Sequence, residues 1–279
     1  MAAAVAAAAL AMHSSPGQAM TPVQRRALAR QEAASRKVAA TWVSQQLSRS
    51  AVVACDEQMC ADLTADGFPA ANLLMLGATS SYPLTADVII QTAAVRALLG
   101  SSFSTNYAPA ILTSCGSGTA AIDIRVIAPH GAATYRQQLA SDLTLRKQVG
   151  SELLASSQIS ALPTAKAQLS SGQVDDRLLY DITVLAGDVQ IKVLGFSNIE
   201  TGASKGIPLR YADLAETVPG VHLSPAAYAA ALVHDLRKLP PQYQPLRIET
   251  ITMGAMPVLQ IEYGAPSPLG LLGPSTGTP

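Results

Sequence analysis

The chain has 279 residues, of which 49% are hydrophobic and 4% aromatic, and its nineteen basic and nineteen acidic residues give a formal net charge of zero. This length and apolar content allow one large domain or two small ones and exclude intrinsic disorder in the middle of the chain. Zero net charge and few aromatic residues argue against a basic or base-stacking surface, so we expect no nucleic-acid partner.

Residues 1–20 open with the apolar run MAAAVAAAALAM, about a dozen residues against the roughly 18–20 that a bilayer-spanning helix needs. No Lys or Arg precedes this run, so it lacks the charged n-region of a signal peptide. We interpret it as a truncated membrane anchor or signal-like segment, which predicts a membrane partner through the N-terminus. An Ala-rich helix or tail is the alternative, and Arg25, Arg26 and Arg30 argue against an anchor if that side is external.

Residues 21–50 are predicted to form a long helix. Thr21 and Gln24 have the spacing of a capping box, and Pro22 stands at the first helical position, where its missing N–H costs little. Mixed charges and scattered alanines suit a stalk or an outer helix. We predict that this helix packs on the rest of the protein through three residues near its end, Trp42, Val43 and Leu47.

Two cysteines stand five residues apart in ACDEQMC, where a strand is predicted to end and a helix to begin. Across such a junction Cys55 and Cys60 can approach to the roughly 5.5 Å Cα separation that a disulfide needs. We expect this disulfide, with two reduced, buried thiols as the alternative. Cys115 is then left over and is interpreted as a small buried hydrophobic residue.

Two stretches of the chain have the same landmarks in the same order, about 120 residues apart. MLGATSSYPLTADVIIQT, from Met75, and VLGFSNIETGASKGIPLR, from Val193, both read as a strand, a polar loop and a second run. Each copy continues through a helix to a β-hairpin, and the hairpin strands AIDIRVI and VLQIEYG alternate apolar and polar residues. The alternative to a duplication is chance similarity, because apolar strands and helices that end in glycine are common in α/β proteins.

The sequence therefore predicts an α/β fold of two tandem related lobes, each ending in a β-hairpin and preceded by the long N-terminal helix. The lobes are predicted at residues 38–156 and 157–268, and the Gly- and Pro-rich residues 269–279 are predicted to be a flexible tail. If the duplication is real, residues 73–77 and 189–195 should occupy equivalent positions in the two lobes.

The candidates for catalysis do not form a recognisable set. His13, His130, His222 and His234 lack metal-ligand spacing, and no glycine motif of a nucleotide site is present. Cys115 in TSCGSG lies between two predicted strands, not on the strand-to-helix turn of a nucleophile elbow. We therefore predict no catalytic residue, no metal site and no cofactor. Helix capping and complementarity to the helix dipole explain the acidic residues near predicted helix starts, namely Asp56, Glu57, Asp62, Asp66, Asp175, Asp176 and Asp181.

The two equivalent loops remain as the candidate ligand site. Ser80 and Asp87 belong to the first loop, and Asn198 and Lys205 belong to the second. Ligands usually bind beyond the carboxyl ends of the strands in α/β sheets, so these four residues are the predicted ligand-binding residues. Solvated connections without a ligand are the alternative.

Four stretches together, ACDEQMC, DVIIQTAAVR, GSGTAAIDIRVIAP and GQVDDRLL, carry a resemblance that spans roughly residues 38–268. The chain resembles a group of actinobacterial proteins identified as membrane-anchored, with an extracellular domain of unknown function. The resemblance implies a location on the extracellular side of the cell membrane, or secretion. It implies no activity, and no catalytic residue is transferred from the group.

These observations lead to two functional hypotheses. The first is an extracytoplasmic, membrane-associated binding or scaffold module that contacts an unknown cell-envelope component or protein partner. The alternative is a cell-envelope hydrolase that uses carboxylates in a cleft between the lobes. A structure separates them, because only the hydrolase requires two carboxylates that converge on one cleft.

Overall fold

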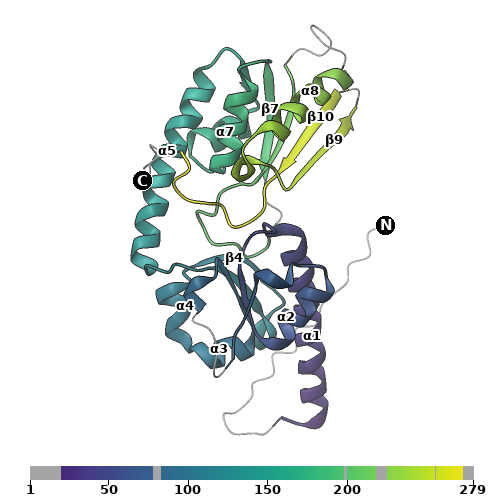
Figure 1. Cartoon of the computed structure of the whole chain (residues 1–279), viewed down its shortest axis with the longest axis vertical. Helices are drawn as coiled ribbons and strands as arrows, with labels where there is room; N and C mark the ends of the chain where they lie inside the picture. Colours follow the sequence, from purple (N-terminus) through teal and green to yellow (C-terminus); the bar gives the residue numbers. More distant parts are fainter. Residues whose placement is uncertain (1–19, 78–82, 198–199, 218–224, 255, 273–279) are drawn as a thin grey trace, which may run out of the picture.

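The computed structural model describes residues 20–77, 83–197, 200–217, 225–254 and 256–272. Within these ranges the chain forms two α/β lobes, each built on a five-stranded mixed sheet, as the sequence predicts (Figure 1). The predicted long N-terminal helix is also confirmed. It spans Pro22–Gln46, and its capping box is formed by Thr21 and Gln24.

The first lobe is a three-layer sandwich. One face of its sheet is covered by α1 and α2, and the opposite face is covered by α3 and α4. Strand β3 is buried on both sides because Val88 and Ile90 contact the first layer and Ile89 contacts the second. The sheet order is β2-β1-β3-β5-β4. The elements are α1 (Pro22–Gln46), β1 (Val53–Cys55), α2 (Glu57–Ala65), β2 (Leu73–Met75), β3 (Val88–Gln91), α3 (Ala93–Leu99), α4 (Ser101–Tyr107), β4 (Ala110–Cys115) and β5 (Ile122–Val126), with 3-10 turns at Ala70–Asn72, Pro83–Thr85 and Gly118–Ala120.

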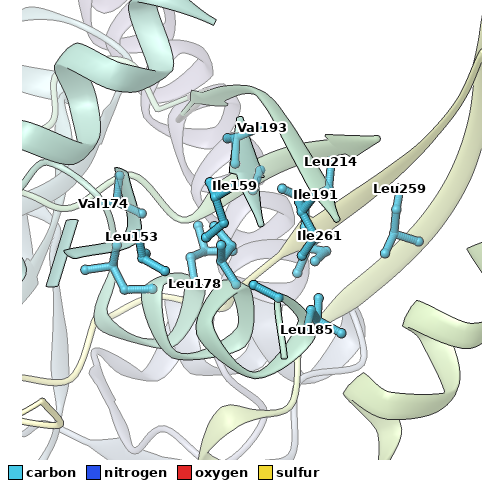
Figure 2. Packing of buried hydrophobic residues seen from close by; sticks show 14 of the residues in the cluster. Leu153, Ile159, Val174, Leu178, Leu185, Ile191, Val193, Leu214, Leu259 and Ile261 are labelled. Atoms are coloured by element: carbon cyan, nitrogen blue, oxygen red, sulfur yellow. The ribbon is translucent and has the colours of Figure 1, made fainter. Parts of the chain in front are cut away.

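The second lobe packs its helices on one face of its sheet. Figure 2 shows the core between them, where Leu178 and Leu185 of α7 meet Ile191 of β7 and Ile261 of β10. The opposite face has polar side chains, including Gln260, whose amide donates to Asp213 at 2.9 Å. The sheet order is β6-β7-β8-β10-β9. The elements are α5 (Ala132–Ala155), β6 (Ile159–Ala161), α6 (Pro163–Ser170), α7 (Asp176–Leu185), β7 (Ile191–Ser197), β8 (Tyr211–Glu216), α8 (Pro225–Lys238), the 3-10 turn η4 (Pro241–Tyr243), β9 (Arg247–Met253) and β10 (Met256–Glu262). The predicted boundary between residues 156 and 157 places α5 in the first lobe, but α5 packs on α6, α7 and β6, so the second lobe begins at α5.

The two lobes have a similar succession of helices and strands, with α6 and α7 in place of the single α2 and α8 in place of α3 and α4, but they differ in sheet order. Each ends in the predicted antiparallel hairpin, and β3-β5-β4 matches β8-β10-β9 in order and direction. The first two strands differ, because β1 lies between β2 and β3 whereas β7 lies between β6 and β8. Strand β2 is therefore an edge strand and β7 an inner one, so the prediction that residues 73–77 and 189–195 occupy equivalent positions is wrong.

Two long-range connections join the lobes. Residues 263–266, which we call the strap, run beside the end of α1, where the Ala265 N–H donates to Gln46 at 2.7 Å and the Ser48 N–H donates to Ala265 at 2.9 Å. The loop that follows β7 lies along β4, where the Ser114 N–H donates to Thr201 and the Ser204 N–H donates to Ile111. Each lobe is thus tied to a segment of the other.

Two sequence predictions about the chain ends need correction. Residues 269–272 of the predicted flexible tail pack on the second lobe, since the Gly270 N–H donates to Asp142 at 2.8 Å and Leu272 contacts the core; residues 273–279 lie outside the described ranges. A membrane partner through the N-terminus is contradicted: among the described helices, none is long and apolar enough to cross a bilayer. The predicted anchor itself lies outside those residues, except for Met20.

Candidate functional site

A cleft opens where the two lobes meet, and we call it the junction cleft. Its volume is about 550 Å³, and residues of both lobes line it. The first lobe contributes residues 48–51, between α1 and β1, together with Asp87. The second lobe contributes the start of α7, the residues around η4, and the strap. The polar side chains used below are Arg49, Asp87, Arg177, Gln242 and Gln244.

Asp87 is an exposed residue at the amino end of β3. Its carboxylate accepts a hydrogen bond from the Val52 N–H at 2.8 Å, and its own N–H donates to Val52 at 2.9 Å, so it fixes the start of β1 against the start of β3. Asp87 also lines a neighbouring cavity of about 390 Å³ with His130 and Tyr135. One carboxylate oxygen of Asp87 thus holds the two strands together. Asp87 and Pro266 line both the junction cleft and this neighbouring cavity.

Arg177 is held rigidly at the back of the junction cleft. Its guanidinium makes two hydrogen bonds to Asp175, at 2.9 and 2.8 Å, donates to Gly264 at 3.0 Å and lies 4.6 Å from the centre of the Tyr263 ring. Burial alone would raise the pKa of Asp175, but the charge and hydrogen bonds of Arg177 outweigh it and lower that pKa. The pair is a preorganised ionic support for the strap.

Two further acidic groups are buried beneath this support. The Tyr263 hydroxyl contacts both Asp181 and the Tyr243 carbonyl, and burial raises the pKa of Asp181 to about 8. Burial, followed by the hydrogen bonding and charge of Asp142, raises the pKa of Asp176 to about 8 as well. Asp176 lies 3.5 Å from the Arg146 guanidinium and is 2% exposed.

The sequence interpretation of these acids as helix caps holds for Asp175, which accepts from the Arg177 N–H at the start of α7, and for Asp56 at the start of α2. Asp176 stands in the first turn of α7, as this interpretation expects, but its side chain is buried. The interpretation is wrong for Asp181, which lies in the middle of α7 and is buried inside a polar network. A clue is visible in the sequence, since VDDRLL places charges directly against an apolar run. That pattern does not say which charges turn inward.

The two described residues of the predicted ligand site lie in different cavities. Lys205 lines a cavity of about 490 Å³ with Arg136, Arg146 and Leu143, away from Asp87. The cause is chain direction. Strand β3 runs parallel to β1 and β2, so the chain must return to the amino ends of these strands before β3 begins. Strand β7, in contrast, turns directly into the antiparallel β8. Asp87 is thus at the amino end of its strand. Ser80 and Asn198 lie outside the described residues.

The predicted disulfide is present. Cys55 at the end of β1 and Cys60 in α2 are bonded, with a Cα separation of 5.5 Å, and Cys115 is free and buried. Burial, followed by the charge of Asp123, raises the pKa of the Cys115 thiol to about 11, which disfavours the nucleophilic thiolate. No cluster of three potential metal ligands occurs in the described part of the chain.

No protein-family model, characterised protein or solved structure matches the chain. The geometry of the cleft is therefore what indicates its chemistry. Guanidinium, amide, hydroxyl and carboxylate groups line it together with prolines, and Asp87 is its acidic lining residue. Such a lining can hold a polar ligand through hydrogen bonds but does not present the two facing carboxylates of a glycosidase site.

Three features of this site could not be found from the sequence. Arg49 and Arg177 are far apart in the chain, and nothing in their neighbourhoods links them. The strap at residues 263–266 reads only as the end of a strand followed by proline. Apolar periodicity predicts which residues form elements, but it does not predict which loops of two lobes meet.

Proposed function

We propose that the protein is a non-enzymatic, extracytoplasmic binding module that takes part of a cell-envelope component or protein partner into the junction cleft. The supporting observation is the cleft itself, which is built from both lobes and lined by hydrogen-bonding groups held in place by other contacts. Arg177 is fixed by Asp175 and Gly264, and Arg49 donates to Gly67 at 2.5 Å. Preorganised groups of this kind lower the entropic cost of binding.

The extracytoplasmic location rests on the Cys55–Cys60 disulfide. Structural disulfides persist in oxidising compartments and are rare where thiols are kept reduced. The resemblance to actinobacterial proteins with extracellular domains points the same way. Mass spectrometry of unreduced peptides from cells of the source organism is expected to show the linked pair, and free thiols at both positions would contradict this location.

The hydrolase alternative has less support, because the acids with raised pKa values do not line the cleft. Asp176 and Asp181 are 2% and 0% exposed, respectively, and lie behind Arg146 and Tyr263. A general acid must reach the bond that it protonates. Release of soluble fragments from envelope polymers by the purified protein, abolished in Asp87→Asn, would favour the hydrolase over the binding module.

The binding proposal is tested by blocking the cleft without touching its supports. Gln242 is exposed in the cleft wall, so Gln242→Trp should obstruct the cleft and leave the fold intact. Gln137→Trp, on the exposed side of α5, adds the same side chain elsewhere. We expect the immobilised wild-type protein and Gln137→Trp to retain the same component from an envelope extract, and Gln242→Trp to lose it. Equal retention by all three proteins would contradict the cleft as the site, and no specific retention by wild type would contradict the binding function.

A further inference from the structure

Helix α5 carries an apolar stripe with an arginine at each end. The stripe consists of Arg136, Leu139, Ala140, Leu143 and Arg146. Residues three or four apart lie on the same side of a helix, and all five line the cavity of about 490 Å³ that Lys205 also lines. We call this cavity the α5 groove. It extends along the helix, because the ten residues from Arg136 to Arg146 span about 15 Å.

Two loops of the second lobe form the other wall of the α5 groove. Residues 172–173 follow α6, and residues 205–209 precede β8. The Leu209 N–H donates to Gln173 at 2.7 Å, and the Ser204 N–H donates to Ile111 at 2.9 Å. The second loop is thus tied down on both sides of Lys205. The groove is therefore formed before any ligand binds, as is usual for small-molecule sites.

One end of the α5 groove carries two exposed cations. A β-carbon built on Gly206 would lie 3.7 Å from Cδ2 of Leu139, so the loop meets α5 at this point. Arg136 is one helical turn before Leu139, and Lys205 is next to Gly206, so both cations belong to this end. Within the part of the chain that the structure describes, neither is ion-paired with a carboxylate.

The rest of the α5 groove is uncharged overall. At the far end Arg146 is 1% exposed, and its Nε donates to Asp142 at 2.8 Å, which neutralises its charge. A terminal nitrogen of Arg146 donates to Gly172 at 2.6 Å. No acidic residue lines the groove among the described residues. The lining between the two ends is apolar and consists of Leu139, Ala140, Leu143, Ile207 and Leu209.

We propose that the α5 groove binds an amphiphilic anion that has one carboxylate head and an unbranched aliphatic chain. The head lies between Arg136 and Lys205, because these two cations have no carboxylate of their own and guanidinium groups bind carboxylates with two hydrogen bonds. The chain lies over Leu139 and Leu143, where its burial removes apolar surface from water. The volume of the groove is within the roughly 300–1,000 Å³ of small-molecule sites.

The α5 groove is separate from the junction cleft. No described residue lines both of them. A ligand in the groove therefore neither requires nor excludes a partner in the cleft, and each proposal can fail without the other.

The class of ligand is tested with the full chain by isothermal titration calorimetry. Decanoate below its micelle concentration is the probe, decyltrimethylammonium has the same chain with a cationic head, and acetate has the head alone. We expect decanoate to bind at one site per chain and the other two compounds to bind at least ~10-fold more weakly. Equal affinity for either of them, or no saturable binding of decanoate, overturns the proposal.

The location is tested by filling the groove. Ala140 is exposed on α5 and lines the groove, so Ala140→Trp should obstruct it without changing the core. Gln137→Trp adds the same side chain to the same helix outside the groove. We expect Ala140→Trp to raise the dissociation constant of decanoate by ~10-fold or more and Gln137→Trp to leave it unchanged. Equal affinities of the two variants would exclude the groove as the site.

The role of the two cations is tested by removing their charge, and this variant decides if Ala140→Trp does not fold. Arg136→Gln combined with Lys205→Gln should bind decanoate ~10-fold more weakly than wild type. Arg26→Gln combined with Arg30→Gln removes the same charge from exposed positions on α1 and should bind like wild type. Equal binding by the two double variants contradicts the head contact.

A lipid surface presents similar chemistry, so wild type is also mixed with phosphatidylglycerol vesicles. We expect no sedimentation with the vesicles, because the apolar lining lies between α5 and two loops and does not protrude. Sedimentation with vesicles but no binding of decanoate would assign the two cations to a membrane surface and overturn the proposal.

Discussion

Tyr263 has one hydroxyl proton but two oxygen neighbours, Asp181 and the Tyr243 carbonyl. If Asp181 is protonated, it donates to the Tyr263 hydroxyl, which then donates to Tyr243, and both contacts are satisfied. Burial, which raises the pKa of Asp181 to about 8, favours the same neutral form at pH 7. In this neutral form Asp181 is a buried carboxylic acid that donates a hydrogen bond to Tyr263 in the core.

This assignment predicts a pH dependence of stability. The pKa of Asp181 is about 8 in the folded chain and 3.8 for a solvated aspartate. Protonation of Asp181 therefore stabilises the folded state fully below about pH 4, and this stabilisation is lost as pH rises to about 8. Asp181→Asn stays neutral, so its stability relative to wild type should rise by up to ~1.4 kcal/mol per pH unit across this window. Urea unfolding followed by circular dichroism at pH 5 to 8 measures the difference.

Asp188→Asn is the matched control, because Asp188 is an exposed carboxylate just beyond the same helix. Its stability relative to wild type should not vary with pH by a comparable amount. A constant difference between Asp181→Asn and wild type from pH 5 to 8 would show that Asp181 is ionised in the folded protein.

At the scale of elements, α5 and α6 cross at Gly150. A β-carbon added there would lie 2.3 Å from the Leu169 carbonyl oxygen and 2.8 Å from its carbonyl carbon. These are backbone atoms, so they cannot move aside by a rotamer change. The close approach of the two helices therefore requires glycine at this position, although glycine weakens a helix interior.

Gly150→Ala should consequently destabilise the protein by about 1–3 kcal/mol, since the overpacking cost exceeds the gain in helix propensity. The measurement is the free energy of unfolding in urea. Ser151→Ala, at an exposed position on the same helix, should change stability by less than about 0.5 kcal/mol. A Gly150→Ala variant as stable as wild type would mean that α6 can shift without loss of packing.

At the scale of the whole molecule, the strap contacts both lobes. A β-carbon at Gly264 would lie 2.8 Å from the Ser48 nitrogen and 3.1 Å from its Cα. The strap is also held from the second lobe by Arg177. Contacts from both sides couple the unfolding of the lobes, so wild type should unfold in a single calorimetric transition.

Gly264→Ala should push the strap away from the end of α1 and weaken this coupling. We expect two resolved calorimetric transitions, or one at a lower midpoint, together with faster proteolysis in residues 263–268. Gly195→Ala is the control, because a β-carbon there meets no atom within 4 Å. If Gly264→Ala melts like wild type in one transition, the strap does not couple the lobes.

Local interactions explain the parts of the fold that the sequence predicted. The capping box at Thr21, the cap at Asp56 and the Cys55–Cys60 disulfide all join residues no more than five apart, so their spacing alone contains the information. The alternating hairpin strands are predictable for the same reason. By itself the sequence determined the α/β class, the long first helix, the two hairpins and this disulfide.

The tertiary structure alone decided how these elements are arranged. The loops after β2 and β7 look alike in sequence, yet one leads to a parallel strand and the other to an antiparallel one, which separates Asp87 from Lys205. The burial of Asp176 and Asp181, the meeting of Arg177 with Gly264 and the position of Lys205 beside α5 also depend on distant partners. Strand order and charge burial follow from packing between segments far apart in the chain, and no local pattern encodes that choice.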